Sequence, residues 1–234
     1  ASADGQRTAR VAVGAVAGVL QHAVTVLLQI ALVPLVIQRA GAETVGAYSI
    51  LMQLIAWGTI THCGLGVASC RFMSQAHAQD DGQERLGAVL RTTRTMYWVA
   101  NAAFAAFVCA AACLAPNLVT LGDAPTTQAA LGSQLRICGV IYAAWLLLRT
   151  PLALYGDALY ATHHVALFNL VSAAGTTARL ATSIMLTWCG LGLIGLTVAA
   201  VAGDFLVGLA QYACFRRLHP RVRAAVPAAD TRLK

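Results

Sequence analysis

The chain has 234 residues, of which 59% are apolar and only 11% carry a charge. Soluble domains contain about 25% charged and 45–50% apolar residues, so this composition excludes an ordinary water-exposed globular protein. The net charge of +7 does not indicate nucleic-acid binding, because the arginines lie at the ends of apolar runs and no basic stripe interleaved with aromatic residues occurs.

Six apolar stretches are long enough to cross a bilayer core of about 30 Å, which takes about 20 helical residues. In chain order they are 11–37, 46–68, 95–114, 135–155, 165–189 and 193–215. The first is too long for a cleavable signal peptide and continues without a small-residue cleavage site. The sequence therefore predicts an all-α, polytopic membrane protein with a six-helix transmembrane lobe over 1–215 and a basic cytoplasmic linker or tail over 216–234.

Arginine gathers near the N-terminus, in the second connection between spans, and after the last span. These residues are Arg7 and Arg10; Arg71, Arg85, Arg91 and Arg94; and Arg216, Arg217, Arg221 and Arg223. Short cytoplasmic segments are enriched in Lys and Arg, and a six-span topology places all three segments on one side. We therefore expect both termini to be cytoplasmic, in the inner membrane of a bacterium.

Three predicted helices carry polar or small residues at helical spacing along one face. The stripes are Gly14, Gly18, His22, Thr25 and Gln29; Asn169, Ser172, Thr176, Arg179, Ser183 and Thr187; and Thr197, Ala200, Asp204, Gly208 and Gln211. One interpretation is close helix packing, which small residues allow. The other is the lining of a hydrated cavity.

Arg179 and Asp204 are the two charges near the middle of predicted spans, where a charge costs about 2.5–3.5 kcal/mol on insertion scales. Arg179 lies 11 residues before the hairpin at Gly190, and Asp204 lies 14 after it. At 1.5 Å per residue their depths differ by about 4–5 Å. The sequence therefore predicts that they are close enough to pair, and leaves open whether the pair is structural or functional.

Other polar residues admit two interpretations each. Arg149 is placed either to reach the membrane surface with its long side chain or to line a cavity. His22 fits a hydrogen-bonded core position better than a proton relay. Asp157, His163 and His164 together resemble a metal cluster, but their spacing is not that of an established site, and we interpret them as part of a solvated loop.

Motifs for enzymatic chemistry are missing from the sequence. It contains no GxxxxGK[ST], GxSxG or HExxH, and no GxGxxG after a strand. The seven cysteines form no CxxC pair and no Cys/His metal spacing. We expect a protein that is not an enzyme and that uses no cofactor and no metal.

The segment VPLVIQRAGAETVGAYSILMQLIAWGTITHCGLGVASCR, residues 33–71, resembles the polysaccharide-export branch of the multidrug/oligosaccharidyl-lipid/polysaccharide flippase superfamily. The matching positions are Pro34, Arg39, Gly41, Glu43, Gly46, Tyr48, Gly64, Gly66 and Arg71. Looser matches are Pro151 with Tyr155 and Gly156, and the GLGLIGL start of the last span. His62 or Cys63 stands where the family often has Asp, so any role of that acid has no carrier here.

The resemblance implies an N-terminal lobe of a flippase whose two six-helix lobes rock about a central cavity. The implied cargo is an undecaprenyl-pyrophosphate-linked oligosaccharide, whose phosphates suit Arg. Arg179 would be the main residue facing the headgroup, with Arg149 near the entrance. The other candidate substrate-binding residues are Asn169, Thr176, Asp204, His22 and Gln29.

The implied partners are membrane lipids, the lipid-linked oligosaccharide, and a second six-helix lobe, either covalently joined or supplied by a homodimer. Glycosyltransferases and a polymerase are further candidates, and nucleic acid is not expected. Two other functions stay open. A cation-coupled multidrug antiporter would need buried carboxylates, of which only Asp204 lies within the predicted spans, and a non-transporting scaffold of a glycan assembly complex would need none.

Overall fold

A computed structural model of the chain describes residues 3–61, 64–79, 82–118 and 125–223, and these residues form helices joined by short turns. The helices are α1 Ala3–Ala40, α2 Ala42–Thr61, α3 Leu65–His77, α4 Gly82–Leu118, α5 Pro125–Ala161, α6 Val165–Trp188, α7 Gly192–Leu218 and the short 3-10 helix η1 Pro220–Arg223. The prediction of an all-helical protein is therefore confirmed for the described part of the chain.

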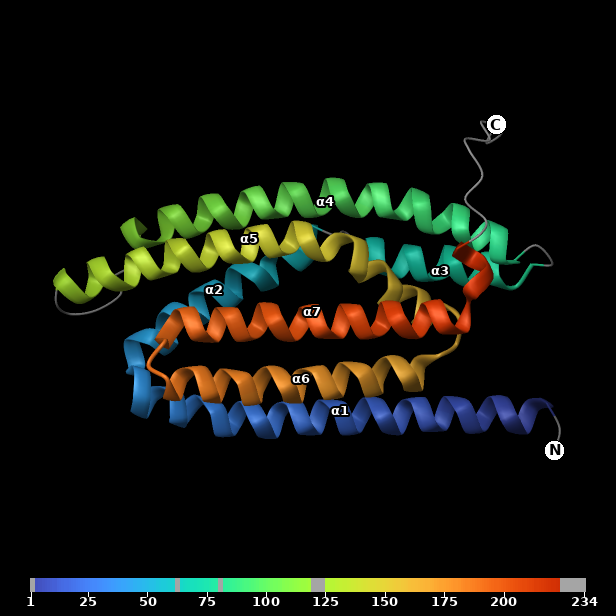
Figure 1. Cartoon of the computed structure of the whole chain (residues 1–234), viewed down its shortest axis with the longest axis horizontal. Coiled ribbons are helices and arrows are strands. Elements are labelled where there is room, and N and C mark those ends of the chain that lie inside the picture. Colours follow the sequence, from blue (N-terminus) through green and yellow to red (C-terminus); the bar gives the residue numbers. More distant parts are fainter. Residues whose placement is uncertain (1–2, 62–63, 80–81, 119–124, 224–234) are drawn as a thin grey trace.

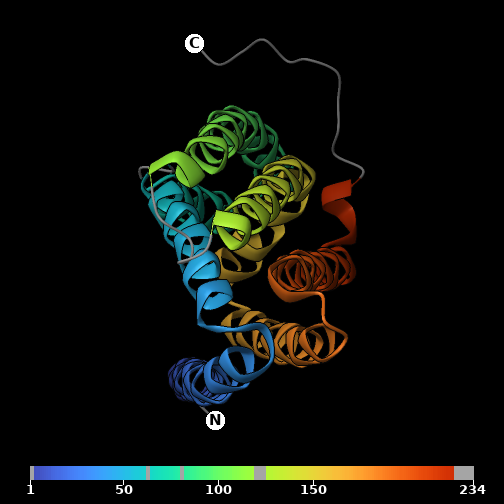
Figure 2. The same ribbon diagram turned by 90° about the vertical axis from the view of Figure 1, so that its left-hand side faces the viewer.

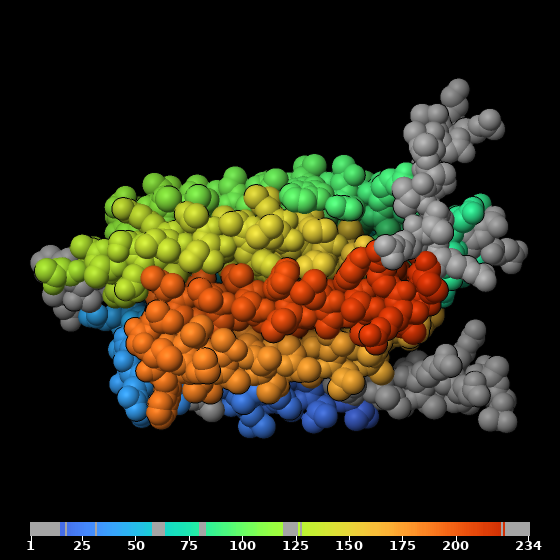
Figure 3. Space-filling view, viewed as in Figure 1, coloured from blue at the N-terminus to red at the C-terminus, as the bar shows by residue number. Residues whose placement is uncertain are grey.

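The long helices lie side by side along the long axis of the molecule (Figure 1). Viewed from one end, α4 and α5 form one side of the bundle, α7 and α6 follow, and α1 lies at its margin (Figure 2). α4 packs mainly on α5, α7 packs on both α5 and α6, and α1 packs mainly on α6. The first turns of α1 and the end of α7 lie at the same end of the bundle (Figure 1). The space-filling surface of α5, α7 and α6 is continuous from one helix to the next (Figure 3).

Four helical segments among the described residues are long and apolar enough to cross a membrane. They are Gly18–Ala40, Gln83–Leu118, Gln128–Ala161 and Gly192–Leu218. These segments indicate a membrane-embedded protein, because soluble helices of this length are rarely so apolar. α2 and α6 are not among the four, so their crossing of the membrane stays a prediction.

The predicted second span, 46–68, is divided in the structure. α2 ends at Thr61 and α3 begins at Leu65, while Gly64 adopts a φ of 75°. Glycine tolerates this left-handed conformation, which does not continue a right-handed helix. His62 and Cys63 lie outside the described residues. The predicted loop after residue 68 is also mostly helical, since α3 continues to His77 and α4 starts at Gly82.

The third, fourth and sixth predicted spans are longer as helices than as apolar stretches. The predicted ranges 95–114, 135–155 and 193–215 correspond to α4 over 82–118, α5 over 125–161 and α7 over 192–218. A hydropathy window measures the length of apolar sequence, whereas a helix can continue past it with polar side chains. The segments 85–94 and 156–161 were therefore wrongly predicted to be loops, and α7 continues to Leu218, past Arg216, where the tail was predicted to begin.

The α4–α5 contact is the most extensive between two helices of the described chain. A Cβ atom built on Gly139 would lie 2.2 Å from the Cβ of Ala112, so the two backbones approach closely at this point. About three turns further along the interface, Asn101 donates a buried hydrogen bond of 3.0 Å from Nδ2 to Oγ1 of Thr150. This pairing satisfies polar groups that would otherwise be costly inside a membrane.

Candidate functional site

Three charged side chains from three different helices meet beside the α5–α7 and α6–α7 contacts. Nη1 of Arg149 on α5 lies 3.6 Å from Oδ2 of Asp204 on α7, and Nη1 of Arg179 on α6 lies 4.0 Å from Oδ1 of the same carboxylate. The predicted proximity of Arg179 and Asp204 is confirmed. Arg149 joins them, so one carboxylate serves two arginines, and we call these three residues the charged triad.

Close packing of α6 on α7 places two members of the triad. A Cβ atom on Gly203 would lie 2.5 Å from the Cβ of Arg179, and one on Gly175 would lie 1.9 Å from Cγ2 of Val207. Only glycine fits at such short separations. Gly175 and Gly203, which are not members of the predicted polar stripes, thus form a packing seam that brings Arg179 beside Asp204.

The triad is not sealed inside the bundle. The side chains of Arg149, Arg179 and Asp204 are 44%, 30% and 29% exposed. Tyr48 on α2 and Tyr142 on α5 lie within electrostatic range of these charges. The site therefore combines two accessible cations with nearby phenolic hydroxyl groups.

The geometry of the triad leaves donor capacity in both arginines. A guanidinium group has five N–H donors, and a strong charge-assisted hydrogen bond to a carboxylate is 2.7–2.9 Å long. The separations from Arg149 and Arg179 to Asp204, 3.6 and 4.0 Å, are longer than that. An anion with several acceptor oxygens, such as a phosphate, can engage both guanidinium groups better than one shared carboxylate does.

The remaining candidate residues are not gathered at the triad. Thr176 lies one turn before Arg179 on α6 and is half-buried. Asn169 faces α1, because a Cβ atom on Gly18 would lie 3.3 Å from its Nδ2. His22 and Gln29 are exposed on α1. A role for these four residues in substrate binding stays a prediction.

The position of Asp157 differs from the one that the sequence predicted. It was expected in a solvated loop, but it lies on α5 within the candidate span Gln128–Ala161 and is half-buried. Its Oδ2 accepts a hydrogen bond of 2.5 Å from the hydroxyl of Tyr97 on α4, and its backbone oxygen lies 3.6 Å from Sγ of Cys70 on α3. Asp157 is thus a partly buried carboxylate of the described helices, in addition to Asp204. The apolar residues 158–161 after Asp157 are the signal that the helix continues.

The two histidines grouped with Asp157 lie apart from it in the turn after α5. His163 is exposed with a φ of 63°, and His164 immediately precedes α6. Across the residues that the structure describes, no three His, Cys, Asp or Glu side chains are arranged to hold a metal ion.

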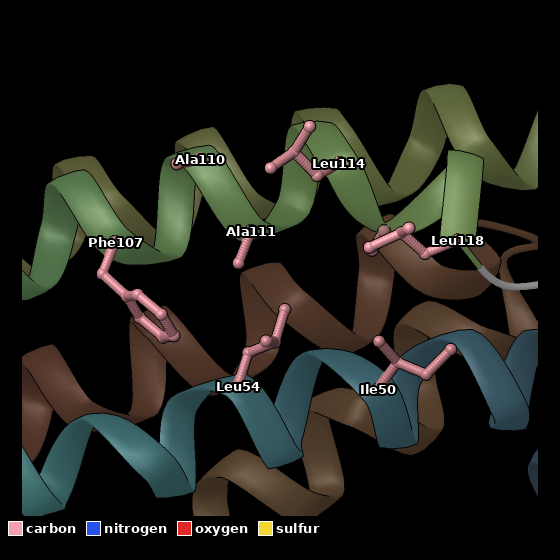
Figure 4. A pocket seen from close by; sticks show the side chains of 8 residues that line it. Ile50, Leu54, Phe107, Ala110, Ala111, Leu114 and Leu118 are labelled. Atoms are coloured by element: carbon pink, nitrogen blue, oxygen red, sulfur yellow. The ribbon is translucent and has the colours of Figure 1, made fainter.

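An apolar groove of about 460 Å³ lies between α2 and α4 (Figure 4). Its lining consists of Ile50, Leu54, Phe107, Ala110, Ala111, Leu114, Ala115 and Leu118. No charged side chain lines it, so it offers contacts to hydrocarbon and none to a polar headgroup. The groove is therefore suited to apolar groups, unlike the charged triad.

Comparisons with protein-family models, with curated proteins and with solved structures found no match to this chain.

Proposed function

We propose that the chain is a lobe of a flippase in the bacterial inner membrane that moves an undecaprenyl-pyrophosphate-linked oligosaccharide between leaflets by alternating access. The observation that carries this proposal is the convergence of Arg149 and Arg179 on the single carboxylate of Asp204. Charges inside apolar bundles are expensive, and they are retained mainly along substrate or ion pathways.

The chemistry of the triad suits a lipid-linked pyrophosphate. Two arginines on adjacent helices bind phosphate oxygens with directional hydrogen bonds, which are stronger for charged partners. The exposure of all three side chains leaves room for an incoming headgroup. The sugar would contact hydroxyl-bearing positions of α6 such as Thr176. A second six-helix lobe, covalent or from another copy, would close the cavity on the opposite side.

The direct test is substitution of each arginine in the full-length protein. We expect Arg179→Gln and Arg149→Gln to lower surface glycan by about tenfold or more, because a hydrogen bond to a charged group contributes about 1.5–3 kcal/mol. Arg136→Gln is the matched control, since Arg136 is an exposed arginine on the same helix as Arg149. Protein level in the membrane is measured in parallel. Normal export by Arg179→Gln at normal protein level would contradict the proposal.

A cation-coupled antiporter is the second candidate, and Asp157 is the observation that favours it. Among the described candidate spans, Asp157 and Asp204 carry partly buried carboxylates, whereas the carboxylate of Glu84 is exposed. The hydroxyl of Tyr97 holds the Asp157 carboxylate in a defined position. If the protein is an antiporter, Asp157→Asn abolishes pH- or sodium-driven drug efflux in vesicles. If it is a glycan flippase without a cation site here, no such efflux is detected for either form.

A further inference from the structure

Three histidines from separate parts of the sequence lie close together at one end of the bundle, toward which α3 and α7 end and α6 begins (Figure 1). His77 lies in the last turn of α3, His164 precedes α6, and His219 follows α7. The ring centroid of His219 is 5.5 Å from that of His77 and 5.9 Å from that of His164. Phe215 packs on the His219 ring at 5.0 Å. His219 therefore connects three chain segments.

The cluster contains polar atoms that are buried without a partner. His219 is only 6% exposed, and its Nε2 atom has no hydrogen-bond partner. Nδ1 of His77 is likewise buried and unpartnered. Nδ1 of His164 lies 3.2 Å from the hydroxyl of Thr162. Unpartnered buried nitrogen atoms are uncommon, and in a histidine they are the atoms that take up a proton.

The surroundings of His219 disfavour its charged form. Burial, together with the nearby His77 and His164, lowers the pKa of His219 from its ordinary value of 6.5. The last turn of α7 brings Arg216, which donates to the hydroxyl of Tyr212 and adds no negative charge.

The other elements around the cluster supply no counterion to His219 in the described structure. α4 contributes apolar Leu86 and Val89 to the same core as Phe215, while its Glu84 and Arg85 are exposed. On α5, Asp157 is engaged by Tyr97. The charges that act on His219 come from the two other histidines.

We infer that His77, His164 and His219 form a pH-sensitive latch that holds the ends of α3 and α7 and the start of α6 together at neutral pH and releases them on acidification. A histidine with a lowered folded-state pKa contributes its full stability above the unfolded pKa, near pH 6.5, where it is neutral in both states. The contribution falls as the pH drops from about 6.5 toward the lowered pKa. Protonation then places like charges side by side.

Hydrogen exchange of the full-length protein in lipid nanodiscs at pH 7.5 and 5.5, corrected for intrinsic exchange rates, tests the latch. We expect protection in segments 76–79 and 219–223 to fall at pH 5.5, by up to about tenfold per pH unit below 6.5 for one proton taken up on opening. Segments in the middle of α5 should keep their protection. Unchanged protection of the two latch segments in the wild type would overturn the inference.

Substitutions separate the latch from a general acid effect. His219→Phe keeps an aromatic ring but does not titrate, so its latch segments should stay protected at pH 5.5. His163→Asn is the matched control, because His163 is exposed and Asn tolerates its positive φ. This variant should open like the wild type. An equal acid response in His219→Phe would contradict the latch. If the latch segments of His219→Phe are less protected than those of the wild type at pH 7.5, the variant is destabilised, and histidine NMR titration of the unmodified protein is the test instead. Titration of the cluster at or above pH 6.5 would then contradict the inference.

Discussion

Two neighbouring residues of α5 take part in opposite kinds of helix contact. Thr150 is fully buried and receives the hydrogen bond of Asn101 from α4. Arg149 is 44% exposed and lies 3.6 Å from Asp204 of α7. One side of α5 is thus a closed, neutral and tightly packed interface, and the other is an open, charged one. The difference indicates that the α4–α5 contact stabilises the fold, whereas the charged side chains between α5, α6 and α7 remain partly exposed.

The largest loss of stability is expected where the closed interface has least space. Gly139→Ala places a Cβ atom 2.2 Å from that of Ala112, so the α4 and α5 backbones must separate. Overpacking of this kind costs about 1–3 kcal/mol. Gly46→Ala adds the same methyl group where no atom lies within 4 Å and serves as control. Thermal unfolding in detergent should show a lower midpoint for Gly139→Ala only. Equal unfolding midpoints for the two variants would mean that α4 and α5 can separate at Gly139 with little loss of stability.

A smaller loss is expected from the buried hydrogen bond between Asn101 and Thr150. Interhelical hydrogen bonds in membranes contribute about 0.6 kcal/mol on average and up to about 1.7. A double-mutant cycle with Asn101→Leu and Thr150→Val should therefore give a coupling free energy in this range. Thr150 also donates to the backbone oxygen of Leu146, so Asn101→Leu leaves its hydroxyl hydrogen-bonded. A coupling free energy of zero would mean that the hydrogen bond between Asn101 and Thr150 does not stabilise the α4–α5 interface.

The smallest loss of stability is expected at the open side, together with the clearest change in binding. Asp204→Asn removes the carboxylate shared by Arg149 and Arg179, all three being partly exposed. Exposed ion pairs contribute about 0–1 kcal/mol, so the unfolding midpoint should barely move. Without a competing carboxylate, the arginines should retain a lipid pyrophosphate several-fold more tightly in native mass spectrometry, with a dependence on salt. Unfolding of this variant, or weaker retention, would show that Asp204 is needed to hold the arginines in place.

The sequence predicted the features that depend on counting residues along regular helices. The Arg179–Asp204 contact followed from their similar distances to the hairpin at Gly190, 11 and 14 residues, and a continuous helix preserves such distances. Arg149 could not be assigned, because its position depends on how α5 packs against α7. Asp157 was misplaced because its charge and Gly156 interrupt the apolar sequence, whereas α5 continues past them to Ala161. At the division between α2 and α3, Gly64 has a φ of 75°, and hydropathy does not measure such an angle.

The division at Gly64 gives α3 a mechanical property that an unbroken helix would lack. α3 has 13 residues and is therefore about 20 Å long. Its first turns lie beside the Tyr97 hydroxyl and Asp157, and its last turn carries His77. A rotation of about 10° about Gly64 would move His77 by about 3 Å on a rod of this length. The first turns of α3 thus lie at the half-buried carboxylate of Asp157 and its last turn lies at the histidine cluster, so a rotation about Gly64 would move the histidine end furthest.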